Sequence, residues 1–477
     1  MKGVVAAGHP ETAAAGADVL RAGGNAVDAA VAAVLASFAV ESPLTGFGAG
    51  GYMMVHREGE AEGPTLIDFF VAAPGLDGVE RGTELVPVPI HFGAEMAQTF
   101  YVGPASCGVP GTAAGLERAL RRFGTMPLAE LVGPGVRLAR EGAPLSRQQA
   151  YLLEILAPIH ETMAATRELY APGGARLGEG ERFAFPELAE ALERYGAEGA
   201  APFYSGEVAA AISEFVLARG GTLGPGDLAR YEPIERRPIA AGFRGTEVLT
   251  NPPPAAGGTL IAYSLALLEQ LGASSGPEQL VAALKGANER RADLLGSTTH
   301  IAVMDASGSC ATVTCSNGSG SGVMVPGTGV ILNNMLGEED LNPLGFHRIA
   351  PGRRVPSMMA PTVVTREGEI VLGLGSAGSN RIRSAILQTV VRAVEQGLPV
   401  AEAVAAPRLH FEAETVQAEP GIDPAALARL EANGLAVFRW PAINLFFGGV
   451  QAVARDPWTG ALSGGGDPRR GGAVASA

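Results

Sequence analysis

Apolar and polar positions along the chain predict strands near both ends and helices between them. The period is helical over Glu11–Ala22, and most of residues 108–230 follow the same pattern, Arg147–His160 among them. Beyond residue 298 the pattern alternates, and Ile301–Met304 is expected to pair with Ala311–Cys315 as a hairpin across a short turn. Sheets covered by helices predict a layered α/β protein.

The remaining elements follow the same two periods. Helices are predicted at Ala26–Phe38, Thr259–Leu271, Glu278–Leu295 and Ile382–Glu395. A second hairpin is predicted between Thr362–Thr365 and Ile370–Leu374. A last hairpin is expected between Gln451–Ala454 and the end of the chain.

The composition is that of a folded protein with a small-molecule substrate. A hydrophobic content of 47% and a mean hydropathy of +0.19 argue against disorder. A net charge of −14, with acids spread along the chain, disfavours nucleic acid as a partner because phosphate binding needs a basic face. No apolar run reaches the ~18 residues of a membrane span, and the N-terminal run is too short for a signal peptide. We therefore expect no membrane contact and a cytoplasmic location.

Neither a metal nor a cofactor is expected. Cys107, Cys310 and Cys315 form no CxxC pair, and the seven His residues show no metal-ligand spacing. The loop at residues 46–51 matches GxGxxG, but a helix precedes it and a strand follows, which is the wrong order for dinucleotide binding. We expect this loop to permit a close backbone approach instead.

The segment from Ser297 to His300 carries the most chemical meaning. If the peptide bond between Ser297 and Thr298 is cut, the freed α-amine of Thr298 can act as the base for its own hydroxyl. Taken alone, the segment is more typical of an ordinary strand, because β-branched residues favour strands. His300 would share a strand face with Thr298, and a structural hydrogen bond is its expected role.

Short motifs spread over nearly the whole chain occur in a specific order. They are Gly24–Ala30, Gly48–Met53, Val109–Thr112, Phe123–Leu128, Pro252–Pro254 with Gly257 and Gly258, Thr298–His300, Leu332–Asn334 and Ala406–Arg408. Together they resemble the γ-glutamyltransferase family of N-terminal nucleophile hydrolases. The resemblance implies a four-layer αββα sandwich and a proenzyme that cuts itself before Thr298. Residues 1–297 and 298–477 would then remain intertwined in one domain.

The resemblance also implies how the site would react. Thr298 would attack a γ-glutamyl amide and form an acyl-enzyme, which passes the acyl group to water or an amine. The oxyanion hole would use backbone N–H groups of Gly378 and Ser379 at a helix start. Ser316 would hydrogen-bond the nucleophile, with Thr314 as the candidate if the register slips.

The positions that would recognise glutamate depart from the family pattern. The family arginine that holds the α-carboxylate is Phe70 here, and the second residue of a Ser-Ser pair is Met358, after Ser357. A lost charge-assisted hydrogen bond costs about 1.5–3 kcal/mol. Three further positions align with family residues that contact the glutamyl group: Asn317 or Gly318 with an asparagine, Met335 with a polar residue, and Glu338 with the acid that holds the α-amine. The candidates for a replacement cation are Arg353, Arg354 and Arg381.

Three functions remain open. The first is γ-glutamyl hydrolysis or transfer, including that of glutathione. The second is amide hydrolysis of a less charged acyl group, which Phe70 and Met358 favour. The third is an uncleaved relative that only binds a ligand. The two fragments of the enzyme are expected to associate, and further oligomerisation is left open.

Overall fold

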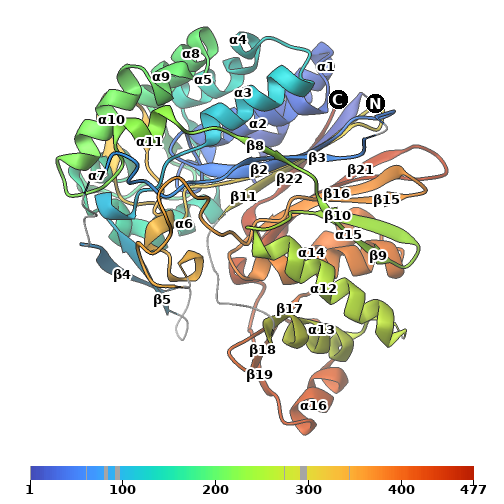
Figure 1. Cartoon of the computed structure of the whole chain (residues 1–477). Coiled ribbons are helices and arrows are strands. Elements are labelled where there is room, and N and C mark those ends of the chain that lie inside the picture. The colour runs from blue at the N-terminus through green and yellow to red at the C-terminus, as the bar shows by residue number, and fades with distance from the viewer. Residues whose placement is uncertain are drawn as a thin grey trace.

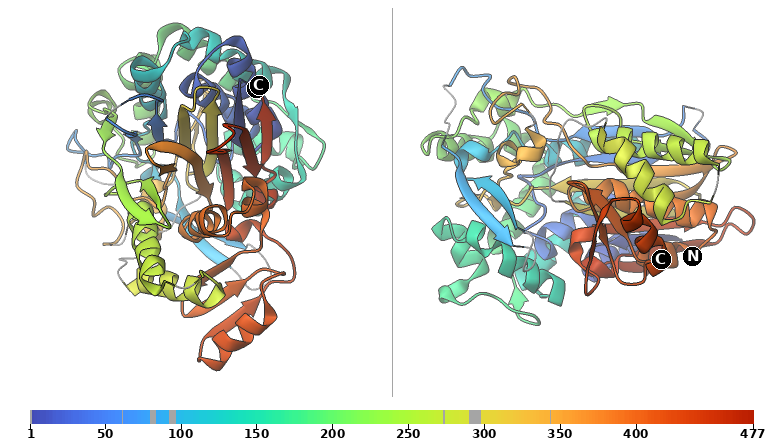
Figure 2. Two further views of the ribbon diagram at one scale, coloured as in Figure 1. Left: turned by 90° about the vertical axis from the view of Figure 1, so that its right-hand side faces the viewer. Right: turned by 90° about the horizontal axis from the view of Figure 1, so that it is seen from below.

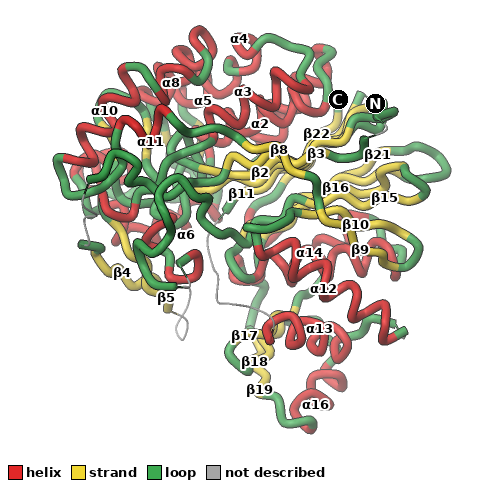
Figure 3. The backbone as a smooth tube through the Cα atoms, viewed as in Figure 1, coloured by secondary structure: helices red, strands yellow, loops and turns green. Residues whose placement is uncertain are grey.

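Two antiparallel β-sheets lie face to face at the centre of the computed structural model, and helices cover both outer faces (Figure 1). The structure describes residues 2–60, 62–79, 84–91, 97–272, 274–289, 298–342 and 344–477. Figure 3 shows the strands inside and the helices outside. The predicted four-layer αββα sandwich is confirmed.

The first sheet has seven strands in which both ends of the chain meet. Its order is β22 (Ala473–Ser476), β1 (Gly3–Ala7), β11 (Thr299–Asp305), β12 (Cys310–Ser316), β2 (Gly50–His56), β3 (Thr65–Phe69) and β8 (Ile234–Arg236). The hairpin predicted after residue 298 is β11 paired with β12, with Val303 opposite Ala311. Every residue of β11 and β12 is buried, so the strand that follows Thr298 lies deep in the protein.

The second sheet has six strands from the C-terminal half of the chain. Its order is β21 (Leu462–Gly466), β20 (Gly449–Arg455), β16 (Glu369–Ala377), β15 (Thr362–Arg366), β10 (Thr246–Thr250) and β9 (Ile239–Phe243). The predicted hairpin around residues 367–368 is confirmed as β15 with β16. The last hairpin differs from the prediction. β20 pairs with β21, and the final strand β22 crosses to β1 of the other sheet, because alternation alone does not specify a partner.

The helices divide between the two outer faces. α1 (Pro10–Ala22) and α2 (Ala26–Val40) pack on the first sheet, and α12 (Ala256–Leu271), α14 (Arg381–Val390) and α15 (Val400–Ala405) pack on the second. All of α2 is buried, because further helices cover its outer side. The mostly helical stretch predicted after residue 108 contains the helices α3 (Thr112–Phe123), α4 (Leu128–Leu131), α5 (Gly133–Glu141), α6 (Arg147–His160), α7 (Ala164–Tyr170), α8 (Pro186–Glu198), α9 (Ala201–Tyr204), α10 (Glu207–Leu217) and α11 (Pro225–Ala229).

Two predicted helices have different ends in the structure. The α-helical part of α14 ends at Val390, and a π-helical turn, η5 (Val391–Glu395), follows it directly. α13 covers Pro277–Glu289, and the rest of the helix predicted to reach Leu295 lies outside the described residues. Within the described part of the chain, no helix is long and apolar enough to cross a membrane.

Smaller elements lie at the edges of the sandwich. The hairpin β4 (Val86–His91) with β5 (Ala97–Val102) flanks one side; the short pairs are β6 (Ala143–Pro144) with β7 (Arg182–Phe183) and β13 (Met324–Val325) with β14 (Val330–Ile331). Figure 2 shows a small lobe that projects beyond the sandwich. It contains β17 (Leu409–Glu412), β18 (Thr415–Ala418), β19 (Ala436–Arg439) and α16 (Pro424–Ala432).

The two sheets approach each other closely where Gly375 of β16 faces His300 of β11. A β-carbon built on Gly375 would lie 2.3 Å from Cε1 of His300. We expect Gly375→Ala to lower the free energy of unfolding by about 1–3 kcal/mol, because a packed interior does not yield to an added methyl group. Urea denaturation measures this change.

Gly242→Ala is the matched control on β9 of the same sheet. No heavy atom lies within 4 Å of a β-carbon built there, so its free energy of unfolding should stay within about 0.5 kcal/mol of the parent. Equal effects of the two substitutions would contradict the close contact at Gly375.

Candidate active site

Thr298 is buried directly before β11 and borders two separate cavities. The one lined by Glu41 and Arg470 is the wider of the two, and the one lined by Phe70 is the narrower. We call them the large cavity and the small cavity. Ser297, on the other side of the predicted cleavage bond, lies outside the described residues. Thr298 therefore lies between two recesses with different linings.

The small cavity is apolar apart from two hydroxyl groups. Its lining residues are Phe70, Thr298, Met335, Leu341, Ser357, Met358, Met359 and Ile382. The ring of Phe70 is buried and stacks on Tyr52 with 5.4 Å between centroids. The hydroxyl of Ser357 accepts a hydrogen bond from the backbone N–H of Met359 at 3.0 Å. The three departures at residues 70, 335 and 358 thus gather around Thr298.

The large cavity has apolar walls with a few polar groups. Its apolar side chains include Leu152 and Leu153 of α6, Tyr170 of α7 and Phe183 of β7. Its polar side chains include Glu41, Gln148, Gln149, His300, Gln451 and Arg470. A recess with apolar walls and a few polar groups is typical of a small-molecule site.

Gly378 and Ser379 form the turn between β16 and α14. Both have positive φ, +118° and +59°, which is uncommon for a residue with a side chain such as Ser379. Ala377, just before the turn, lines the large cavity, and Ile382, just after it, lines the small one. The turn therefore passes between the two cavities that Thr298 borders. Neither Gly378 nor Ser379 lines a cavity itself.

Three other predicted site residues, Ser316, Asn317 and Glu338, line neither cavity. Ser316 ends β12, and its hydroxyl accepts from the N–H of Gly318 at 2.8 Å. Asn317 is buried, and its N–H donates to the carbonyl of Leu44 at 2.8 Å. Glu338 accepts from the N–H of Ser319 at 2.9 Å through one carboxyl oxygen.

Burial raises the pKa of Glu338 to about 8, although the hydrogen bond from Ser319 acts in the opposite direction. The other carboxyl oxygen has no hydrogen-bond partner among the described residues. Glu338 is therefore mostly protonated at neutral pH, and a neutral carboxyl group is a poor counter-ion for an amine.

His300 makes the structural hydrogen bond that the sequence predicted. Its Nδ1 lies 2.8 Å from the hydroxyl of Thr314 on the paired strand. Burial lowers its pKa to about 3, so the ring is neutral at physiological pH. Because Thr314 is engaged with His300, it is less suited than Ser316 to serve the nucleophile.

Glu41 is a residue that the sequence analysis did not single out. Its carboxyl oxygens accept from the hydroxyls of Thr12 at 2.9 Å and Thr299 at 2.7 Å. Burial raises the pKa of Glu41. The side chain lines the large cavity and holds the residue next to Thr298, which makes it a positioning group for the start of β11. The signal available in the sequence was an acidic residue directly after the long apolar helix α2.

The three arginines considered as replacement cations line neither cavity. Arg354 pairs with Asp68 at 3.2 Å, and Arg381 donates to the carbonyl of Phe446 at 3.1 Å. Arg353 is exposed. The arginine that does line the large cavity is Arg470, which lies far from the glutamate motifs in sequence and gave no local signal. Among the described residues, no cluster of His, Cys, Asp and Glu is arranged to hold a metal ion.

Comparison with known sequences gives a consistent result along the whole chain. The family model described as gamma-glutamyltranspeptidase matches residues 12–296 and 282–477. The acylase ACY 1 proenzyme of Pseudomonas sp. (strain SE83) is 33% identical over 97% of this chain and 91% of its own. The glutathione hydrolase proenzyme of Escherichia coli (strain K12) is 31% identical over 98% and 90%.

Solved structures give the same grouping. A cephalosporin acylase from Bacillus halodurans superposes with a TM-score of 0.87 and 26% identity, over 100% of this chain and 96% of its own. The γ-glutamyltranspeptidase of Helicobacter pylori reaches a TM-score of 0.51 and 29% identity, over 60% and 81%. The chain is thus similar both to glutathione hydrolases and to acylases.

The raised pKa of Glu338 predicts a pH-dependent stability. Its pKa in the folded protein, about 8, lies above the ordinary value of 4.5, so the stabilisation is complete below pH 4.5 and is lost as pH rises through 8. Relative to Glu338→Gln, the wild-type free energy of unfolding should fall by about 4 kcal/mol between pH 4.5 and pH 8. Urea denaturation at a series of pH values measures it.

Glu339→Gln is the control, because Glu339 is the exposed neighbour on the same segment. The difference between wild type and Glu339→Gln should not change over this pH range. A difference between wild type and Glu338→Gln that is equally constant would mean that Glu338 ionises normally.

Proposed function

The chain belongs to the γ-glutamyltranspeptidase family, a family of hydrolases and acyltransferases, and on that premise we propose that it is a self-processing amidohydrolase for a compact apolar acyl group. The observation that carries this proposal is the small cavity, where Phe70, Met335 and Met358 stand beside Thr298. A carboxylate placed among them would lose its hydration without gaining a charged partner.

The proposed processing step uses the hydroxyl of Thr298. Its oxygen attacks the carbonyl carbon of Ser297, the hydroxyl proton passes to the amide nitrogen, and the C–N bond breaks, so that an ester replaces the peptide bond and the α-amine of Thr298 is freed. Water then hydrolyses the ester, which releases fragments 1–297 and 298–477 and restores the hydroxyl of Thr298. The relatives named above are proenzymes, which supports this step.

The proposed reaction then uses the same hydroxyl on a substrate amide. The α-amine of Thr298 takes the hydroxyl proton, the oxygen attacks the amide carbonyl, and the proton passes to the departing amine. Water or another amine releases the acyl group from the resulting ester. Backbone N–H groups of Gly378 and Ser379 would stabilise the oxyanion; their place between the two cavities supports this role. Ser316 would support the nucleophile from the end of β12.

The second candidate function is hydrolysis or transfer of a γ-glutamyl group. It is favoured by the relatives named glutathione hydrolase, at 29% identity for Bacillus subtilis and 31% for Escherichia coli. The polar groups that remain for it are the hydroxyl of Ser357, Asn317 and Glu338. A third reading, an uncleaved chain that only binds a ligand, is separated from both by the processing test below.

Thr298→Ala should abolish both processing and turnover. The predicted cut makes residue 298 the N-terminus of the second fragment, and the substitution removes the hydroxyl group of that residue. Intact-mass spectrometry after long incubation should show one full-length species for the variant and two fragments for the wild type. Thr415→Ala, on the outer lobe, should process normally. A single wild-type species would reject self-processing, and fragments in the variant would mean that another residue is the nucleophile.

Acyl preference separates the two candidate reactions. We expect the wild type to hydrolyse butyryl 4-nitroanilide with a kcat/KM at least about tenfold above that for γ-glutamyl 4-nitroanilide, since one lost charge-assisted hydrogen bond accounts for a ten- to a hundredfold difference. Met358→Ser should narrow this gap by restoring a second hydroxyl next to Ser357, whereas Met358→Leu should not. Faster wild-type hydrolysis of the γ-glutamyl compound would reject the apolar acyl group.

A further inference from the structure

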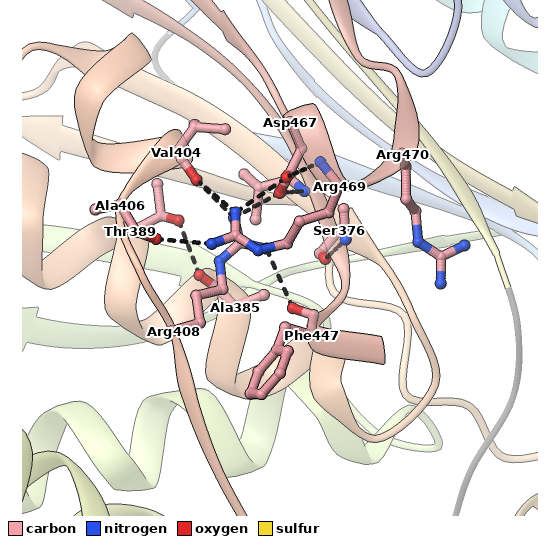
Figure 4. Close-up of polar contacts among 12 residues, drawn as sticks. Ser376, Ala385, Thr389, Val404, Ala406, Arg408, Phe447, Asp467, Arg469 and Arg470 are labelled. Atoms are coloured by element: carbon pink, nitrogen blue, oxygen red, sulfur yellow. Dashed lines mark hydrogen bonds and ion pairs between the residues drawn. The ribbon is translucent and has the colours of Figure 1, made fainter. Parts of the chain in front are cut away.

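Two consecutive arginines near the end of the chain point in different directions. They belong to the short turn η7 (Pro468–Arg470). Figure 4 shows Arg469 directed into a buried cluster with Asp467 and Arg408, and Arg470 directed away from it. Arg470 lines the large cavity together with Thr298. The second arginine therefore presents its charge to the space beside the nucleophile.

The carboxylates nearest to this turn are already engaged by other arginines. Asp467 pairs with Arg408 at 2.6 Å and with Arg469 at 3.1 Å. Glu419 pairs with Arg469 at 2.5 Å. All of these side chains are buried. The cluster is complete without Arg470, so it accounts for Arg469, whereas Asp467 and Glu41 act on the charge of Arg470 only through longer-range attraction.

Arg470 itself has few partners. One guanidinium nitrogen donates to the carbonyl of Leu445 at 3.3 Å, and Nε has no hydrogen-bond partner among the described residues. Burial, and then the charges of Arg381 and Arg408, lower its pKa to about 10, although the charges of Asp467 and Glu41 act in the opposite direction. Arg470 is therefore still a cation at neutral pH. Glu41 lies in the same cavity, but both of its oxygens accept hydrogen bonds from threonines. An anionic ligand group would stabilise this buried guanidinium, because it would supply a hydrogen-bonded counter-charge.

The position of Arg470 relative to Thr298 indicates which part of a substrate it would meet. A β-carbon built on Gly378 would lie 3.5 Å from Nη2 of Arg470, so the guanidinium is next to the turn between the cavities. The acyl group is assigned to the small cavity, which leaves the large cavity for the departing amine. Its other walls, Leu152, Leu153 and Phe183, suit an apolar body.

We propose that Arg470 binds a carboxylate on the amine portion of the substrate, so that the preferred amides release an amine with an apolar body and a carboxylate. The planar guanidinium can hold a carboxylate through two parallel hydrogen bonds. The assignment of the two cavities rests on the function proposed above, whereas the carboxylate site itself does not require turnover.

Binding of the product amine tests the site directly. The probes are 5-amino-2-nitrobenzoate and 4-nitroaniline, which differ only by the carboxylate, and calorimetry on the wild-type protein measures both. The carboxylated amine should bind about tenfold or more tightly. The preference should vanish in Arg470→Met, persist in part in Arg470→Lys, and be unchanged in Arg230→Met, where an exposed arginine is removed. Equal wild-type binding, or a preference that survives in Arg470→Met, would overturn the proposal.

Kinetics distinguish this role from an effect on the oxyanion turn. With butyryl amides of the same two amines, Arg470→Met should raise KM for the carboxylated amide about tenfold and leave kcat nearly unchanged. A fall in kcat that is equal for both amides, with the carboxylate preference intact, would show that Arg470 acts through Gly378 and would reject the proposal. Absence of turnover with a retained binding preference would reject the proposed reaction and support the carboxylate site.

Discussion

The close contact between the two sheets at β11 and β16 is the constraint on which the site depends. Gly375 leaves just enough room for the ring of His300, and His300 is tied to Thr314 on the neighbouring strand. Thr298 lies two residues before His300, so a fully buried strand sets its position. On the outer side Glu41 holds Thr299. If Thr298 is the nucleophile proposed above, it belongs to the packed part of the fold, as reaction geometry at the ångström level requires.

The charges around Thr298 distinguish its two sides. The small cavity is lined by thioether, aliphatic and aromatic groups with two hydroxyls, whereas Glu41 and Arg470 line the large one. An amide is asymmetric in the same sense, since its acyl and amine portions extend in opposite directions from the carbonyl carbon. Under the proposed function, the two linings would select the acyl portion and the amine portion of the substrate separately.

Local patterns predicted the elements well where they are long and periodic. The helix predicted at Arg147–His160 has those limits in the structure, and the hairpin of β11 with β12 was recognised from alternation and its turn. The partner of the last strand was missed, because β22 is equally compatible with several sheet edges and only the packing of both chain ends selects β1. The end of α14 was also missed, since the change to a π-helical turn leaves the apolar period almost unaltered.

By itself the sequence determined the layered α/β class, the family, and Thr298 as the candidate nucleophile. Hydrophobic period, motif composition and motif order can all be read along the chain without knowing which segments touch. It also revealed that the arginine expected at position 70 is a phenylalanine. Only the tertiary structure decided what surrounds Thr298. Residues 70, 335 and 358 converge there from three separate segments, and Arg354 is engaged by Asp68 while Arg470 faces the cavity. Contacts between distant segments depend on sheet pairing and packing, which no local pattern encodes.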